Sequence, residues 1–192
     1  MRIVLSLLVV FISITSFQPR WPADSTLKCV LTTDRKEYKT GEVPQLEVKI
    51  TNAGDKDIYM IGALDGSEML WRMPYCYYTV EKIGGRIDTP KVSRCGNTDP
   101  IHEDDFTVLK PGASFNPYLK RFYPVGIYFS SILNQPGTYK IRFNYNSNSS
   151  EMDSFDGRFN ALGKDSMEVR KLFPKAAKVQ LVSNEIEIKI ID

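Results

Sequence analysis

The sequence has few of the side chains that metal sites and most hydrolytic sites use. Among its 192 residues there are one histidine, His102, and three cysteines. A structural zinc site draws its four ligands mainly from these two residue types, so the chain is poorly supplied for one. Its 25 Lys and Arg nearly balance 23 Asp and Glu, and a net charge of +2 creates no basic field for nucleic acid. We therefore expect no bound metal and no nucleic-acid partner.

The motifs of common enzyme classes are also missing. The sequence contains no G-x-S-x-G nucleophile elbow, no phosphate-binding P-loop and no G-x-G-x-x-G cofactor turn. A serine or cysteine nucleophile would have to use His102 as its base, because no other histidine is present. The sequence predicts a protein that is not an enzyme and has no cofactor. A small hydrolase that uses His102 is the less favoured alternative.

Long apolar runs are limited to one segment at the N-terminus. Residues 3–14 read IVLSLLVVFISI and follow Met1-Arg2. This length fits the apolar region of a signal peptide and falls short of the roughly 20 residues that cross a bilayer. We expect residues 1–17 to be a signal peptide and residues 18–192 to form one domain. The protein would then be exported to the periplasm, cell surface or medium, without a transmembrane anchor. A buried N-terminal strand or helix is the alternative.

Export would place the three cysteines in an oxidising compartment, where two of them are expected to pair. We predict a disulfide between Cys76 and Cys95, because the glycine turn at 84–85 lies between them and can fold their segments together. Cys29 would then be a buried thiol, since it lies on the apolar side of a strand expected over 27–33. Three free, buried cysteines are the alternative.

Most of the remaining chain shows the period-two alternation of half-buried strands. The pattern is strongest in three segments and weaker in six others, with turn signals such as Pro111-Gly112 between them. The strong segments are residues 46–51, 139–145 and 185–190, and the weak ones are 27–33, 57–63, 75–83, 86–93, 105–109 and 114–122. Many short strands of this kind predict an all-β, antiparallel sandwich.

One region, residues 146–178, interrupts this rhythm. It is first polar (NSNSSEMDSFDGRFN) and then mixed (SMEVRKLFPKAAKV). We expect one long loop excursion with a short helix near residues 166–172. An additional surface hairpin is the alternative. Loops of this length in a compact domain are usually functional or mobile.

Three motifs resemble landmarks of bacterial immunoglobulin-like domains of exported proteins. They are the turn YKTGE at 38–42, which leads into a strand that ends at Asn52, the turn LKPG at 109–112, and PGTYKI at 136–141. BsuPI-type proteinase-inhibitor domains have a similar layout. The resemblance implies an immunoglobulin-like sandwich in which the Tyr139 hydroxyl bonds to a crossing loop, as in a tyrosine corner. It implies little about activity, because such scaffolds carry many functions.

The candidate binding residues lie on a strand and a loop. In a strand over 75–83, Cys76 and Val80 would face the core, which leaves Tyr75 and Tyr77 side by side on the outer face. Tyrosine offers a large rigid contact area with a polar tip and is enriched at binding surfaces. Coverage of both rings by other parts of the chain is the alternative.

The loop that Cys95 would pin carries Asn97 and His102, which complete the predicted binding set. We expect the acidic residues around His102 to form a solvated turn before the strand at 106–109. The alternative is a metal site with oxygen ligands from Asp99, Glu103, Asp104 and Asp105. Together these observations predict an exported, non-enzymatic binding or structural module that recognises a protein or glycan. A proteinase inhibitor is the alternative that the BsuPI-like layout implies.

Overall fold

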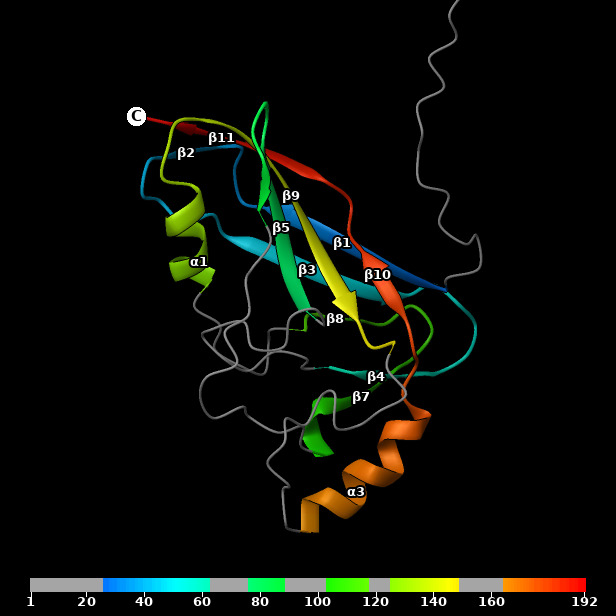
Figure 1. Cartoon of the computed structure of the whole chain (residues 1–192). Helices are drawn as coiled ribbons and strands as arrows, with labels where there is room; N and C mark the ends of the chain where they lie inside the picture. Colours follow the sequence, from blue (N-terminus) through cyan, green and yellow to red (C-terminus); the bar gives the residue numbers. More distant parts are fainter. Residues whose placement is uncertain (1–25, 63–75, 89–102, 118–124, 149–163) are drawn as a thin grey trace, which may run out of the picture.

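The computed structural model describes residues 26–62, 76–88, 103–117, 125–148 and 164–192 (Figure 1). Strands dominate these ranges, and the helices are short. Along the chain the elements are β1 (Leu27–Thr33), β2 (Glu37–Lys39), β3 (Leu46–Asn52), β4 (Ile58–Ile61), β5 (Cys76–Lys82), β6 (Ile87–Asp88), η1 (Glu103–Asp105), β7 (Phe106–Leu109), β8 (Ser114–Phe115), α1 (Val125–Ile132), β9 (Gly137–Asn146), α3 (Lys164–Leu172), η2 (Phe173–Lys175), β10 (Gln180–Val182) and β11 (Ile186–Ile191).

Two sheets form the sandwich, and a third small sheet extends it. The large sheet has the strand order β2-β11-β9-β5-β6, and β10 also pairs with β9. The small sheet has the order β1-β3-β8, and β4 pairs with β7 separately. In Figure 1 the blue and cyan strands β1 and β3 cross behind the green and yellow strands β5 and β9. Neighbouring strands are antiparallel except β2 and β11, which are parallel. The predicted all-β, mainly antiparallel sandwich is confirmed.

The strand predictions succeed where the alternation is long. The three strong segments correspond to β3, β9 and β11, and the weak signal at 27–33 matches β1. The predicted strand over 114–122 is wrong in extent, because β8 ends at Phe115. The predicted helix near 166–172 is confirmed by α3. Residues 149–163 of the predicted 146–178 excursion lie outside the described residues.

The core lies between the sheets, and β9 contributes the most to it. Along β9 the side chains of Tyr139, Ile141, Phe143 and Tyr145 are buried, at every second position. Burial of side chains of this size stabilises the fold by about 1.5–3 kcal/mol each. Opposing and neighbouring elements supply the other buried side chains, which include Leu27, Leu31, Tyr38, Val48, Ile50, Met60, Ile61, Cys76, Tyr78, Val80, Leu109, Phe129, Leu133, Ile188 and Ile190.

Both end tyrosines of β9 have hydrogen-bonded hydroxyl groups. The Tyr139 hydroxyl donates to the carbonyl oxygen of Gln135 at 2.8 Å, so the bond that the tyrosine-corner resemblance implied is present. The Tyr145 hydroxyl donates to the carbonyl oxygen of Ile61 at 2.8 Å, which links β9 to β4. Burial raises the pKa of both tyrosines, so both hydroxyls stay protonated donors at neutral pH.

The side chain of Asn184 connects the two sheets at one edge of the sandwich. Its Oδ1 accepts from the backbone N–H of Leu31 at 2.9 Å, and its Nδ2 donates to the carbonyl oxygen of Leu31 at 3.1 Å. The amide thus substitutes for a neighbouring strand along β1. Such a contact satisfies backbone groups that would otherwise be open to pairing with another chain.

Asn52, at the end of β3, is fully buried and hydrogen-bonded through its whole side-chain amide. Its Nδ2 donates to the carbonyl oxygens of Lys56 at 2.7 Å and Leu109 at 2.8 Å. Its Oδ1 accepts from the Gly54 N–H at 2.9 Å. One side chain therefore joins the β3–β4 turn to the end of β7.

We predict that Asn52→Ala lowers the free energy of unfolding by about 2–3 kcal/mol, because it removes three hydrogen bonds, one of them the buried bond to the carbonyl oxygen of Leu109. Urea unfolding followed by circular dichroism measures the change. Lys49→Ala, at an exposed position of the same strand, serves as the control and should change stability by less than about 0.5 kcal/mol. Equal stability of the two variants would show that the Asn52 amide has no special role.

Candidate functional site

Of the predicted binding residues, only Tyr77 lies in the described part of the chain. Tyr75, Asn97 and His102 lie outside it. On β5 the predicted division of faces is confirmed: Cys76, like Tyr78 and Val80, is buried, whereas Tyr77 and Thr79 are half-buried on the other face.

The described residues include only one of the two cysteines of the predicted disulfide, Cys76. Cys95 lies outside the described residues, so its bond to Cys76 stays a prediction. Cys29 is half-buried on β1 and forms no disulfide with Cys76. Burial raises the pKa of the Cys29 thiol to about 12, which keeps it protonated and weakly nucleophilic at neutral pH.

A strip of uncharged, mostly polar side chains surrounds Tyr77 on the outer face of the large sheet. Asn144 of β9 lies directly opposite Tyr77, and Val182 of β10 lies opposite Asn144 on the other side. Directly opposed residues of antiparallel strands point to the same face, so these three side chains form one row across the sheet. We call the surface formed by this row and its neighbours the Tyr77 face; its members are Tyr77, Thr79, Asn144, Asn146, Gln180 and Val182.

The Tyr77 face is internally ordered by hydrogen bonds. The Nδ2 of Asn144 donates to the Thr79 hydroxyl at 2.8 Å and more weakly to the Tyr77 carbonyl oxygen at 3.4 Å. These bonds fix the orientation of the Asn144 amide beside the Tyr77 ring. The face therefore presents a positioned aromatic side chain together with amide and hydroxyl groups.

A compact ion cluster borders the Tyr77 face. The Glu185 carboxylate lies 2.6 Å from the Arg142 guanidinium and 3.0 Å from the Lys140 ammonium. The hydrogen bond from Lys140, followed by that from Arg142, lowers the pKa of Glu185 below its usual 4.5. Because the carboxylate neutralises part of the positive charge, the cluster carries a net formal charge of only +1.

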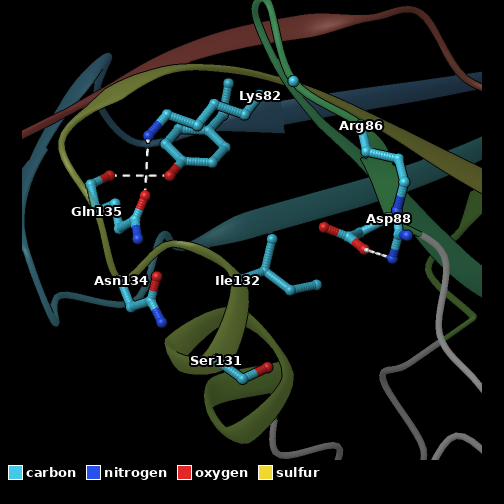
Figure 2. Close-up of a pocket in the computed structure, with 9 residues that line it drawn as sticks. Lys82, Arg86, Asp88, Ser131, Ile132, Asn134 and Gln135 are labelled. Atoms are coloured by element: carbon cyan, nitrogen blue, oxygen red, sulfur yellow. Dashed lines mark hydrogen bonds and ion pairs between the residues drawn. The ribbon is translucent and has the colours of Figure 1, made fainter.

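A second candidate site is a pocket between the β5–β6 hairpin and the C-terminal end of α1. Its volume is about 370 Å³. Figure 2 shows Arg86 and Asp88 on the hairpin side, Ser131, Ile132 and Asn134 on the side of α1, and the Lys82 ammonium next to Gln135 at one end. The lining residues are Lys82, Gly85, Arg86, Asp88, Ser131, Ile132, Asn134, Gln135 and Tyr139. The pocket thus combines charged, amide and apolar groups.

Sequence reasoning missed this pocket. Glycine turns follow Lys82 at 84–85 and Gln135 at 136–137, and they are the only local signal that both segments end at a sheet edge. Nothing in the sequence shows that the two turns meet, because about 50 residues separate them and α1 was not predicted. The pairing of β5 with β9 brings them together.

The described residues contain no cluster of three or more His, Cys, Asp or Glu side chains arranged to hold a metal ion. In η1, Glu103 and Asp104 are exposed, as expected for a solvated turn. The expectation is wrong for Asp105, which is 1% exposed. The turn carries Asp105 inward against β4, where its carbonyl oxygen accepts from the Gly62 N–H at 2.5 Å.

We predict that Glu185→Gln reduces the loss of stability on acidification. The folded-state pKa of Glu185 lies below its unfolded value of 4.5, so its ion pairs stabilise the fold above that pH and lose this effect as the pH falls through the folded pKa. Because the groups are partly exposed, the contribution is about 0.5–1 kcal/mol. Urea unfolding at pH 7 and at pH 3 measures it, with Glu47→Gln on β3 as the control. An unchanged pH dependence in Glu185→Gln would contradict the prediction.

Comparisons with known proteins give no relative from which a function could be transferred. No protein-family model matches the chain, and no curated protein matches it. The immunoglobulin-like and BsuPI-like resemblances therefore stay predictions. None of the described helices combines the length and apolar character needed to span a bilayer. The candidate functional sites are therefore the Tyr77 face and the pocket between the β5–β6 hairpin and α1.

Proposed function

We propose that the protein is an exported, non-enzymatic binding module that recognises a glycan, or a protein that carries one, through the Tyr77 face. The observation that carries this proposal is the row of Tyr77, Asn144 and Val182, with the Asn144 amide oriented by Thr79. Export rests on the predicted signal peptide at residues 1–17.

The composition of the Tyr77 face favours a glycan. Sugar rings offer apolar C–H faces that stack on an aromatic side chain, and their hydroxyls pair with amide and hydroxyl groups. The face supplies Tyr77 for stacking, and the amides of Asn144, Asn146 and Gln180 for hydrogen bonding. None of the hydrogen bonds found among the described residues uses the Asn144 Oδ1, which can therefore accept from a sugar hydroxyl.

The dimensions of the Tyr77 face also suit an extended ligand. The row Tyr77, Asn144 and Val182 crosses three adjacent strands, which are spaced 4.7–4.9 Å apart, so it spans about 10 Å. Paired strands form a rigid platform, which lowers the entropic cost of binding relative to a mobile loop. We expect the ligand to lie flat along this row.

The alternative functions have no such support in the described structure. Hydrolysis would depend on His102, which lies outside the described residues. A proteinase inhibitor would need a loop such as 94–105 or 146–178 to enter a protease cleft, and residues 94–102 and 149–163 of these loops also lie outside the described residues. No specific observation therefore favours either function over glycan binding.

We predict that the full chain is retained by at least one insoluble polysaccharide among cellulose, chitin and peptidoglycan. In the same sedimentation assay, Tyr77→Ala should bind at least about tenfold more weakly, because loss of a stacked aromatic side chain removes more than about 1.4 kcal/mol of binding energy. Tyr59→Ala is the matched control, since Tyr59 is an exposed tyrosine on β4. It should bind like the parent chain.

Two results would overturn the proposal. One is equal binding of Tyr77→Ala and the parent chain, which would exclude the Tyr77 face. The other is retention by none of the three polysaccharides while circular dichroism shows folded protein.

A further inference from the structure

The pocket between the β5–β6 hairpin and α1 contains two positively charged side chains, Lys82 and Arg86. Each makes only long polar contacts with the other described residues. The Arg86 side chain is 83% exposed, and its nearest carboxylate, Asp88, lies 3.8 Å away. The Lys82 ammonium makes one long hydrogen bond, of 3.3 Å, to the Gln135 Oε1. Both cations therefore retain hydrogen-bond donors for a ligand.

Lys82 is held in position by features of the fold. Its ammonium lies 5.7 Å from the centre of the Tyr139 ring, a distance at which a cation is attracted to an aromatic face. The Tyr139 hydroxyl holds the backbone of Gln135, whose side chain in turn bonds Lys82. Figure 2 shows the Lys82 and Gln135 side chains meeting at one end of the pocket.

Gly137 makes this placement of Lys82 sterically feasible. A Cβ atom at Gly137 would lie 2.6 Å from the Lys82 Cε, and the backbone φ of +152° is one that other residues rarely adopt. A larger residue at position 137 would displace the flexible end of the Lys82 side chain from this position.

We propose that this pocket binds a small hydroxylated monocarboxylate of the sugar-acid class. The ligand carboxylate would pair with the Lys82 ammonium, and its hydroxyls would bond to the amides of Asn134 and Gln135. Arg86, on the other side of the pocket beside Asp88, would add its positive charge at longer range. Ile132 and the Tyr139 ring supply the apolar part of the lining.

Charge and size both select this ligand class. Two cations and one carboxylate give the pocket a formal charge of +1, which matches a monoanion. A dianion would leave an unbalanced negative charge beside Asp88, and a neutral ligand would leave both cations unused. The volume of about 370 Å³ lies at the lower end of the range for small-molecule sites.

This site is independent of the proposed glycan-binding surface. Lys82 and Tyr77 lie at opposite ends of β5, five residues or about 17 Å apart. The pocket could therefore bind its ligand even if the Tyr77 face bound nothing.

The test is a titration of the ¹⁵N-labelled full chain with D-glucuronate, D-glucose and inorganic phosphate, followed by amide chemical shifts. We expect D-glucuronate to shift amides of residues 82–88 and 131–137 and to bind at least about tenfold more tightly than glucose. Inorganic phosphate should bind more weakly than D-glucuronate. Raising the salt concentration should weaken D-glucuronate binding, because the pocket is open to solvent.

Variants that remove a positive charge identify the side chains that bind D-glucuronate. Lys82→Gln should weaken D-glucuronate binding about five- to tenfold and Arg86→Gln about two- to threefold, whereas Lys49→Gln on β3 should leave it unchanged. Arg86 lies in an exposed turn, so its variant keeps the test valid even if Lys82→Gln unfolds. Absence of D-glucuronate binding, equal affinity for glucose, tighter binding of phosphate, or an equal loss in Lys49→Gln would each overturn the proposal.

Discussion

Burial of the inward face of β9 is the constraint on which the other features of the fold depend. This strand lies between β5 on one side and β10 and β11 on the other, so both of its edges are paired. Its buried side chains fill the space between the sheets, and the hydroxyls of Tyr139 and Tyr145 bond to backbone carbonyls at either end. Buried hydroxyls require partners, so these two bonds also define the position of β9 along the sandwich.

The same strand organises both candidate sites. Asn144 and Asn146 point away from the core and form part of the Tyr77 face. At the opposite end of the strand, Tyr139 lines the pocket beneath Lys82. A shift of the β9 register by one residue would exchange its inward and outward side chains and abolish both surfaces. The packing that stabilises the core therefore also fixes the geometry available for binding.

The sequence was informative where local patterning determines structure. Alternation identified β9 and β11 and placed Tyr77 on the outer face of β5. It did not identify β2 or β10, since three residues are too few to show a period. The position of β2 comes from its parallel pairing with β11, about 150 residues away. The pocket was missed for a related reason, because its two walls meet only through the pairing of β5 with β9.

Native-state hydrogen exchange of the backbone amides is the most direct test of the central role of β9. The account predicts that the slowest-exchanging amides are those of residues 139–145, because both edges of β9 are paired and its inward side chains are buried. The amides of β1, at an edge of the small sheet, should exchange faster. Slower exchange in β1 or β3 than in β9 would contradict the account and would place the most stable part of the fold in the small sheet.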